Sequence, residues 1–170
     1  MKDYEQQMAR IRNQMAQLNE QLVQLEAEHL AFSEQQERRL SYLSSREILD
    51  ILEARHGRNG SMATIKRWAD SGYLGEVIDE REAFPLLASK QGNKRFLYPR
   101  EEVFRFLHEK GLFEPAFDIL DRVRLRSPSG QVGALVTSIE RDGDRFTYQV
   151  QLEETGAVLT AIDENDLLLP

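Results

Sequence analysis

The sequence predicts an α+β protein with three consecutive parts: a long coiled-coil helix at 1–40, a domain of short helices with a β-hairpin at 41–111, and a five-stranded β-barrel at 112–170. Three observations predict this class. The first part has no Gly or Pro and spaces its apolar residues alternately four and three apart. The second has helix-capping residues ahead of short apolar stripes. The third has short runs in which apolar and polar residues alternate, separated by turn residues.

Composition limits the chemistry that we expect. The 170 residues carry a net charge of −7 and no Cys, and the three His are scattered. A disulfide framework, a thiolate zinc site and a cysteine nucleophile are therefore excluded. The carboxylates Asp163, Glu164 and Asp166 have no His, Cys or Lys partner nearby, and no glycine-rich phosphate loop occurs. We expect no enzyme activity, no metal and no cofactor.

The chain has no apolar run near the roughly 20 residues that a membrane-spanning helix needs. Its first ten residues, MKDYEQQMAR, lack the apolar core of a signal peptide. These two features predict a cytoplasmic location, near the nucleoid if the chain binds DNA, and no membrane partner.

Residues 1–40 read as one helix with a heptad pattern. Positions flanking the apolar residues are nearly all Gln, Glu, Asn, Arg or Ala, which favours a narrow coiled-coil seam over a helix that packs on its own domain. The pattern is lost after Phe32, so the coil should end at 32–40. We expect a homodimer through this seam, whose a positions are Met8, Met15, Leu22 and His29 and whose d positions are Tyr4, Ile11, Leu18, Leu25 and Phe32.

Two short helices follow, separated by a loop. Ser44 and Glu47 form a capping box before a helix at 46–55, and Ser61 is the N-cap of a helix at 62–71 that Gly72 ends. In the second helix one face is apolar and should point inward: Ile65, Trp68 and Ala69. The opposite face should be exposed: Met62, Ala63, Lys66, Arg67 and Asp70, with Thr64 at the boundary. A helix with a polar, basic outer face after another helix is the helix-turn-helix pattern.

A β-hairpin with a basic tip should follow. Its strands are expected at 84–87 and 94–98 around a turn at Lys90–Asn93. Pro99 is then expected at the first position of a third helix, which ends at Gly111. Val103, Phe104, Phe106 and Leu107 should supply the apolar contacts of this helix.

The stretches LSSREILDIL, SMATIKRWADSGYL and GNKRFLYPREEVFRFL resemble the winged helix-turn-helix of excisionase-like and MerR-type DNA-binding proteins over about residues 42–109. The chain departs from this pattern in a longer loop at 56–60 and an acidic insert at 75–83. The resemblance implies that the second helix enters the major groove of double-stranded DNA and that the hairpin is a wing. It implies these DNA contacts: Ser61, Met62, Ala63, Thr64, Lys66 and Arg67 on the helix, and Lys90, Lys94 and Arg95 on the wing.

Charge is distributed unevenly along the chain. Residues 1–40 hold 5 basic and 7 acidic residues, 41–111 hold 12 and 11, and 112–170 hold 5 and 11. Only the middle part is not acidic, and Arg58, in the loop before the second helix, adds to its basic cluster. This polarity suits one DNA-facing surface, and dimerisation would double its contacts.

Residues 112–170 predict five strands, at 121–125, 133–139, 145–152, 157–162 and 167–169. Five short strands can hide their apolar face by curling into a small barrel. The stretches DRVRLRSPSGQVGALVTSI, YQVQL and AIDENDLLL resemble SH3-like barrels of the KOW and Tudor type. Because this part is acidic, we expect it to bind a protein partner.

Together these features predict a dimeric, site-specific DNA-binding protein that regulates transcription. One alternative is a DNA-targeting adaptor of phage, plasmid or mobile-element kind, in which the barrel recruits other proteins. Another is a scaffold whose winged fold binds only protein. Salt-dependent, sequence-selective DNA binding is expected of the regulator and of the adaptor but not of the scaffold.

Overall fold

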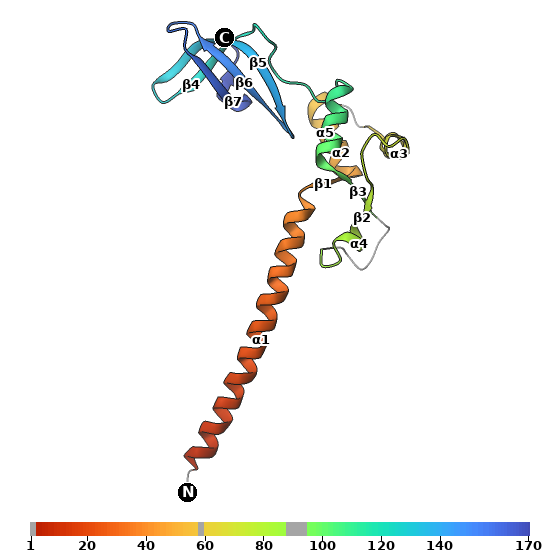
Figure 1. Ribbon diagram of the computed structural model, residues 1–170, viewed down its shortest axis with the longest axis vertical. Coiled ribbons are helices and arrows are strands. Elements are labelled where there is room, and N and C mark those ends of the chain that lie inside the picture. Colours follow the sequence, from red (N-terminus) through yellow and green to blue (C-terminus); the bar gives the residue numbers. More distant parts are fainter. Residues whose placement is uncertain (1–2, 58–59, 88–94) are drawn as a thin grey trace. The chain divides into compact units, whose positions relative to one another are not determined.

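The computed structural model describes residues 3–57, 60–87 and 95–170. It confirms the α+β class: one long N-terminal helix, several short helices, and strands in two sheets (Figure 1). The chain divides into two compact units. Unit 1 comprises 1–42 with 78–96, and unit 2 comprises 43–77 with 97–170.

Unit 1 is dominated by α1 (Tyr4–Arg39), a helix of 36 residues whose first turn is capped by the Asp3 carboxylate. The absence of Gly and Pro lets the helix run without a break. Its last turn is fixed by Arg39, which donates to the Tyr42 carbonyl at 2.9 Å and lies 3.2 Å from the Glu80 carboxylate. None of the described α1 residues is buried.

The remainder of unit 1 is short and irregular. It contains β2 (Ile78–Asp79) and α4 (Glu80–Ala83), whose N-cap is Asp79. Phe84 follows and is buried, with its ring edge-on to Tyr42 at 5.9 Å between centroids.

The first strand of the predicted hairpin is wrong, because residues 84–87 form a turn. The partner of β3 (Phe96–Pro99) is β2, in a sheet of order β1-β3-β2 with β1 at Tyr42–Ser44. Phe84 serves as a buried anchor, and Pro85 has no N–H to donate to a strand. The predicted tip, Lys90–Asn93, lies outside the described residues.

The helices of unit 2 begin at the predicted residue or within one residue of it. Ser44 and Glu47 form the capping box of α2 (Ser45–His56), and Ser61 caps α3 (Met62–Asp70). The third helix, α5, spans Arg100–Glu109. Pro99 is its N-cap and not its first helical residue, so the helix begins one residue later than predicted. The four apolar residues expected to pack from α5 are all buried: Val103, Phe104, Phe106 and Leu107.

All five C-terminal strands are present, as an antiparallel sheet of order β7-β6-β5-β4-β8. β6 has the predicted bounds. A 3₁₀ turn, η1, separates the last two strands. The bounds are β4 Arg122–Ser127, β5 Gly130–Asp142, β6 Arg145–Leu152, β7 Val158–Asp163, η1 Glu164–Asp166 and β8 Leu167–Leu168.

The predicted closure of these strands into a barrel is wrong. β7 and β8 are the two edges of an open sheet, and β8 pairs only with β4, through two residues. The apolar face is covered instead by the segment leading into the sheet. Phe113 packs between Phe104 and Phe146, with ring centroids 4.9 Å from each, and Phe117 lies 5.8 Å from Tyr148. The helices and the sheet of unit 2 therefore share one core.

Candidate nucleic-acid interface

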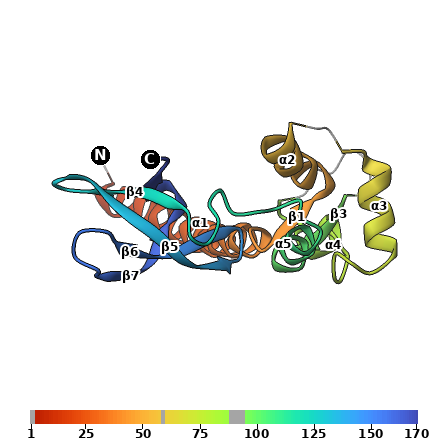
Figure 2. The same ribbon diagram turned by 90° about the horizontal axis from the view of Figure 1, so that it is seen from above.

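The N-terminus of α3 is fixed by two hydroxyl groups. Ser61 Oγ accepts from the Thr64 backbone N–H at 3.2 Å and lies 2.9 Å from Thr64 Oγ1. Because the Ser61 side chain satisfies an amide that the helix cannot, α3 starts at Met62. In both Figure 1 and Figure 2, α3 lies at an outer edge of the helical part of unit 2.

The orientation of α3 matches the sequence prediction. Ile65 is fully buried, and Trp68 and Ala69 are partly buried against the core. The predicted outer face is exposed, and Thr64 lies at the boundary. The structure therefore brings six predicted DNA-contact residues together on and beside one helix: Ser61, Met62, Ala63, Thr64, Lys66 and Arg67.

The polar groups of this face are suited to contact an anion or a base edge. Arg67 Nη2 donates to Thr64 Oγ1 at 3.4 Å, which directs its guanidinium toward the start of the helix. Within the described ranges neither Lys66 nor Arg67 forms an ion pair with an acidic residue. Lys and Arg cations and hydroxyl groups are the donors that commonly bind phosphates and guanine edges, and this face has two cations and two hydroxyls.

Three aromatic rings hold α3 against α5. The Phe106 ring meets Trp68 edge-on and stacks on Tyr73 at an interplanar angle of 8°, each with centroids 5.1 Å apart. Lys110 Nζ lies 5.7 Å from the centre of the same ring. Sequence reasoning placed Trp68 inward but missed Tyr73, which stacks although 53% of it is exposed.

The predicted wing contacts are described only in part. Arg95 is exposed, and its Nε lies 3.6 Å from the Glu80 carboxylate, which also pairs with Arg39. Glu80 belongs to the acidic insert, so part of the insert's charge is used inside unit 1. Arg58, Lys90 and Lys94 lie outside the described residues.

The predicted dimer seam is uncovered in the single chain. Each of its first seven residues has between 46% and 65% of its surface exposed: Tyr4, Met8, Ile11, Met15, Leu18, Leu22 and Leu25. A row of this length leaves a large apolar area in water, which monomeric proteins rarely tolerate.

The C-terminal carboxylates have structural roles in this fold. Asp163 caps the 3₁₀ turn by accepting from the Asn165 N–H, and Glu164 accepts from the Tyr148 hydroxyl at 2.7 Å. Burial, followed by the hydrogen bond and charge of Glu164, raises the pKa of Tyr148 above its ordinary value. These groups orient the start of β8.

No protein-family model, curated protein or solved structure matches the chain. Across the described residues no helix is long and apolar enough to cross a membrane. In the same ranges no three His, Asp or Glu side chains gather as metal ligands would.

Proposed function

We propose that the protein binds double-stranded DNA as a homodimer, that the outer face of α3 reads the major groove, and that the chain regulates transcription. The observation that carries this proposal is the exposed face of α3, which carries Lys66 and Arg67, with the Arg67 guanidinium in contact with the Thr64 hydroxyl. α2 precedes α3 in the chain, which is the order of helices in the predicted helix-turn-helix. The proposal also includes a wing. Of the cations predicted on the wing, Arg95 is the one that lies among the described residues.

A single copy offers few cations, so affinity requires two copies. Each neutralised phosphate contributes to the salt dependence of binding, and two linked heads bind with a high effective concentration at the second half-site. The exposed seam of α1 supplies the linkage in this proposal.

A scaffold that binds only protein is the second candidate. The net charge of −7 opposes non-specific attraction to DNA, and Met62 leaves 57% of its surface exposed at the start of α3. An apolar side chain at that position suits a protein surface as well as a thymine methyl group.

The test begins with selection of bound sites from random DNA fragments. Binding to the selected site and to random DNA is then measured at two salt concentrations for the parent and for Lys66→Ala with Arg67→Ala. We expect the double variant to bind the selected site at least about tenfold more weakly and to show a shallower salt slope. Thermal melting should be unchanged, because both side chains are exposed.

The matched control is Arg122→Ala with Arg124→Ala, which removes the same charge from exposed positions of β4. It should leave selected-site binding unchanged. If the α3 variant binds as tightly as the parent, α3 is not the reader. If no site is selected and salt has no effect, the protein-only scaffold becomes the better account.

A further inference from the structure

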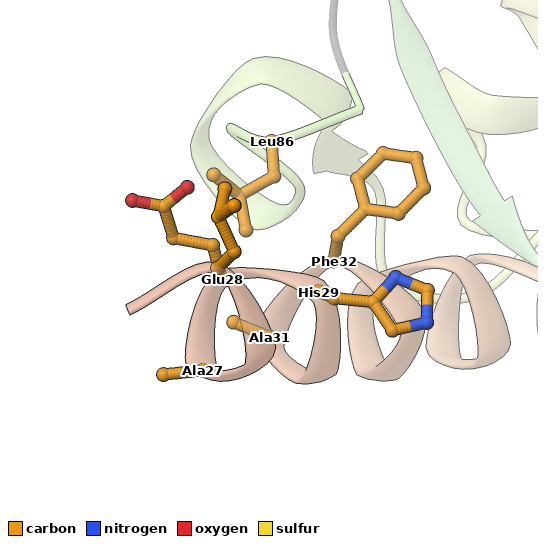
Figure 3. A pocket seen from close by; sticks show the side chains of 7 residues that line it. Ala27, Glu28, His29, Ala31, Phe32 and Leu86 are labelled. Carbon is orange, nitrogen blue, oxygen red and sulfur yellow. The ribbon is translucent and has the colours of Figure 1, made fainter. Parts of the chain in front are cut away.

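An apolar groove lies where the segment after α4 crosses α1. Its lining includes Leu25, His29 and Phe32, which belong to the seam, together with Leu86 from the crossing segment (Figure 3). The Leu86 N–H donates to Gln35 Oε1 at 3.0 Å, which anchors the segment on the helix. Phe32 and Leu86 remain 37% and 50% exposed. The seam therefore ends in a groove that its own chain leaves open.

The charged residues beside the seam can form ion pairs with the partner in one orientation of a helix pair but not in the other. Arg12 and Glu26 both occupy heptad position e. In a parallel pair a g residue faces the e residue five positions later on the partner, which places Gln beside both of them. A parallel pair thus gains no ion pair there. In an antiparallel pair e faces e, and Arg12 can meet the partner's Glu26 twice by symmetry.

The seam residues select one antiparallel register. With the pair centred on Glu20, every described seam residue from Met8 to Phe32 meets another seam residue. A shift by one heptad in one direction brings Glu5 against the partner's Glu26, and the opposite shift places Met8 against the partner's Arg39. The layers of the centred register are Met8 with the partner's Phe32, Ile11 with the partner's His29, Met15 with the partner's Leu25, and Leu18 with the partner's Leu22.

We propose that the occupant of the groove is the N-terminal end of a second copy of α1, in an antiparallel coiled coil centred on Glu20. In this arrangement the partner's Met8 lies against Phe32 and Leu86, and the groove closes each end of the dimer. The inference rests on the proposed dimer and adds its orientation, its register and the contribution of Leu86.

Cysteine cross-linking tests the orientation, because the chain has no Cys of its own. The variants are Ile11→Cys and His29→Cys in the full chain, each first shown to sediment as a dimer under reducing conditions. In the proposed register two copies of residue 11 are separated by about 27 Å along the axis, from 1.5 Å per residue, far beyond the reach of a disulfide. A mixture of the two variants should form a mixed disulfide on oxidation, and neither variant alone should form one.

Other outcomes overturn the proposal in distinguishable ways. Cross-linking of Ile11→Cys with itself would show a parallel pair and leave the dimer intact. No cross-link in any mixture, with a dimer still present, would overturn the proposed register. A parent that sediments as a monomer would overturn the dimer of the proposed function as well.

A charge exchange gives a second, independent readout. Arg12→Glu should weaken dimerisation about tenfold, since two attractive pairs become repulsive, and adding Glu26→Arg should restore it. The matched control is Arg10→Glu, the same charge change at an exposed position off the seam, which should have little effect. Absence of restoration in the double variant would overturn the register. Leu86→Ser should also weaken the dimer, and an unchanged dissociation constant would remove Leu86 from the interface.

Discussion

Replacing Trp68 with alanine tests the packing that positions the outer face of α3. Trp68 is partly buried, and its ring meets the edge of Phe106 with centroids 5.1 Å apart. A large aromatic side chain buries about 150–250 Å², equivalent to roughly 4–6 kcal/mol at about 25 cal/mol per Å². Part of this ring already faces water, and alanine retains the β-carbon. We therefore expect the free energy of unfolding to fall by about 2–3 kcal/mol.

Urea unfolding followed by circular dichroism measures this loss, because Trp68 is the only tryptophan and its fluorescence disappears with it. With a typical dependence of about 1–3 kcal/mol per molar urea, the midpoint should fall by about 0.7–3 M. Trp68→Phe keeps an aromatic ring against Phe106 and should lose less than half as much. An unchanged midpoint for the alanine variant would refute the role of this ring in holding α3.

Two further predictions concern unit 2. Gly75 has φ +80°, and a Cβ there would lie 2.8 Å from Glu102 Cγ, so Gly75→Ala should lose about 1–3 kcal/mol by urea unfolding. Gly72→Ala is its control, with φ +81° and open space around the added atom, and equal losses would show that the Glu102 contact is without effect. Burial alone would raise the pKa of Asp144, but the hydrogen bond and charge of Arg100, 2.7 Å away, hold it below its ordinary value of 3.8. The stability contributed by this pair is present above pH 3.8 and is lost as pH falls through the lower pKa of the folded state. Asp144→Asn should therefore make the free energy of unfolding fall less steeply at acid pH than it does in the parent. An equally steep fall in the variant would contradict this prediction.

The sequence predicted well those features whose signals are local. The Ser44 and Ser61 caps, the inward Ile65 and the bounds of β6 each depend on residues within a few positions of one another. The predicted face of α3 follows in the same way, because helical periodicity alone decides which of its side chains point outward.

Features set by distant residues were predicted poorly. Barrel closure was expected because no other cover for the sheet was visible, yet Phe113 fills that role from the segment after α5. The turn at 84–87 was mistaken for a strand, since nothing local shows that Phe84 packs on Tyr42. The pairing of Arg39 with Glu80, 41 positions apart, has no sequence signature either.

Breaking the α1 seam should reveal whether dimerisation and DNA binding are energetically linked. Leu18→Asp with Leu22→Asp places four carboxylates at the centre of the proposed pair, where none can be hydrated without separating the helices. The full-length variant should sediment as a monomer and bind the selected DNA about a hundredfold more weakly, since the second head loses its effective concentration.

Val23→Asp with Leu30→Asp is the matched control, because both residues are exposed apolar side chains off the seam. This variant should remain a dimer and bind like the parent. If the seam variant is monomeric and still binds the selected DNA with parental affinity, one copy suffices and the proposed avidity is wrong. If both variants dissociate equally, the heptad positions do not define the interface. Only loss of both properties in the seam variant, with both retained in the control, shows that dimerisation through α1 and DNA binding by α3 are energetically linked.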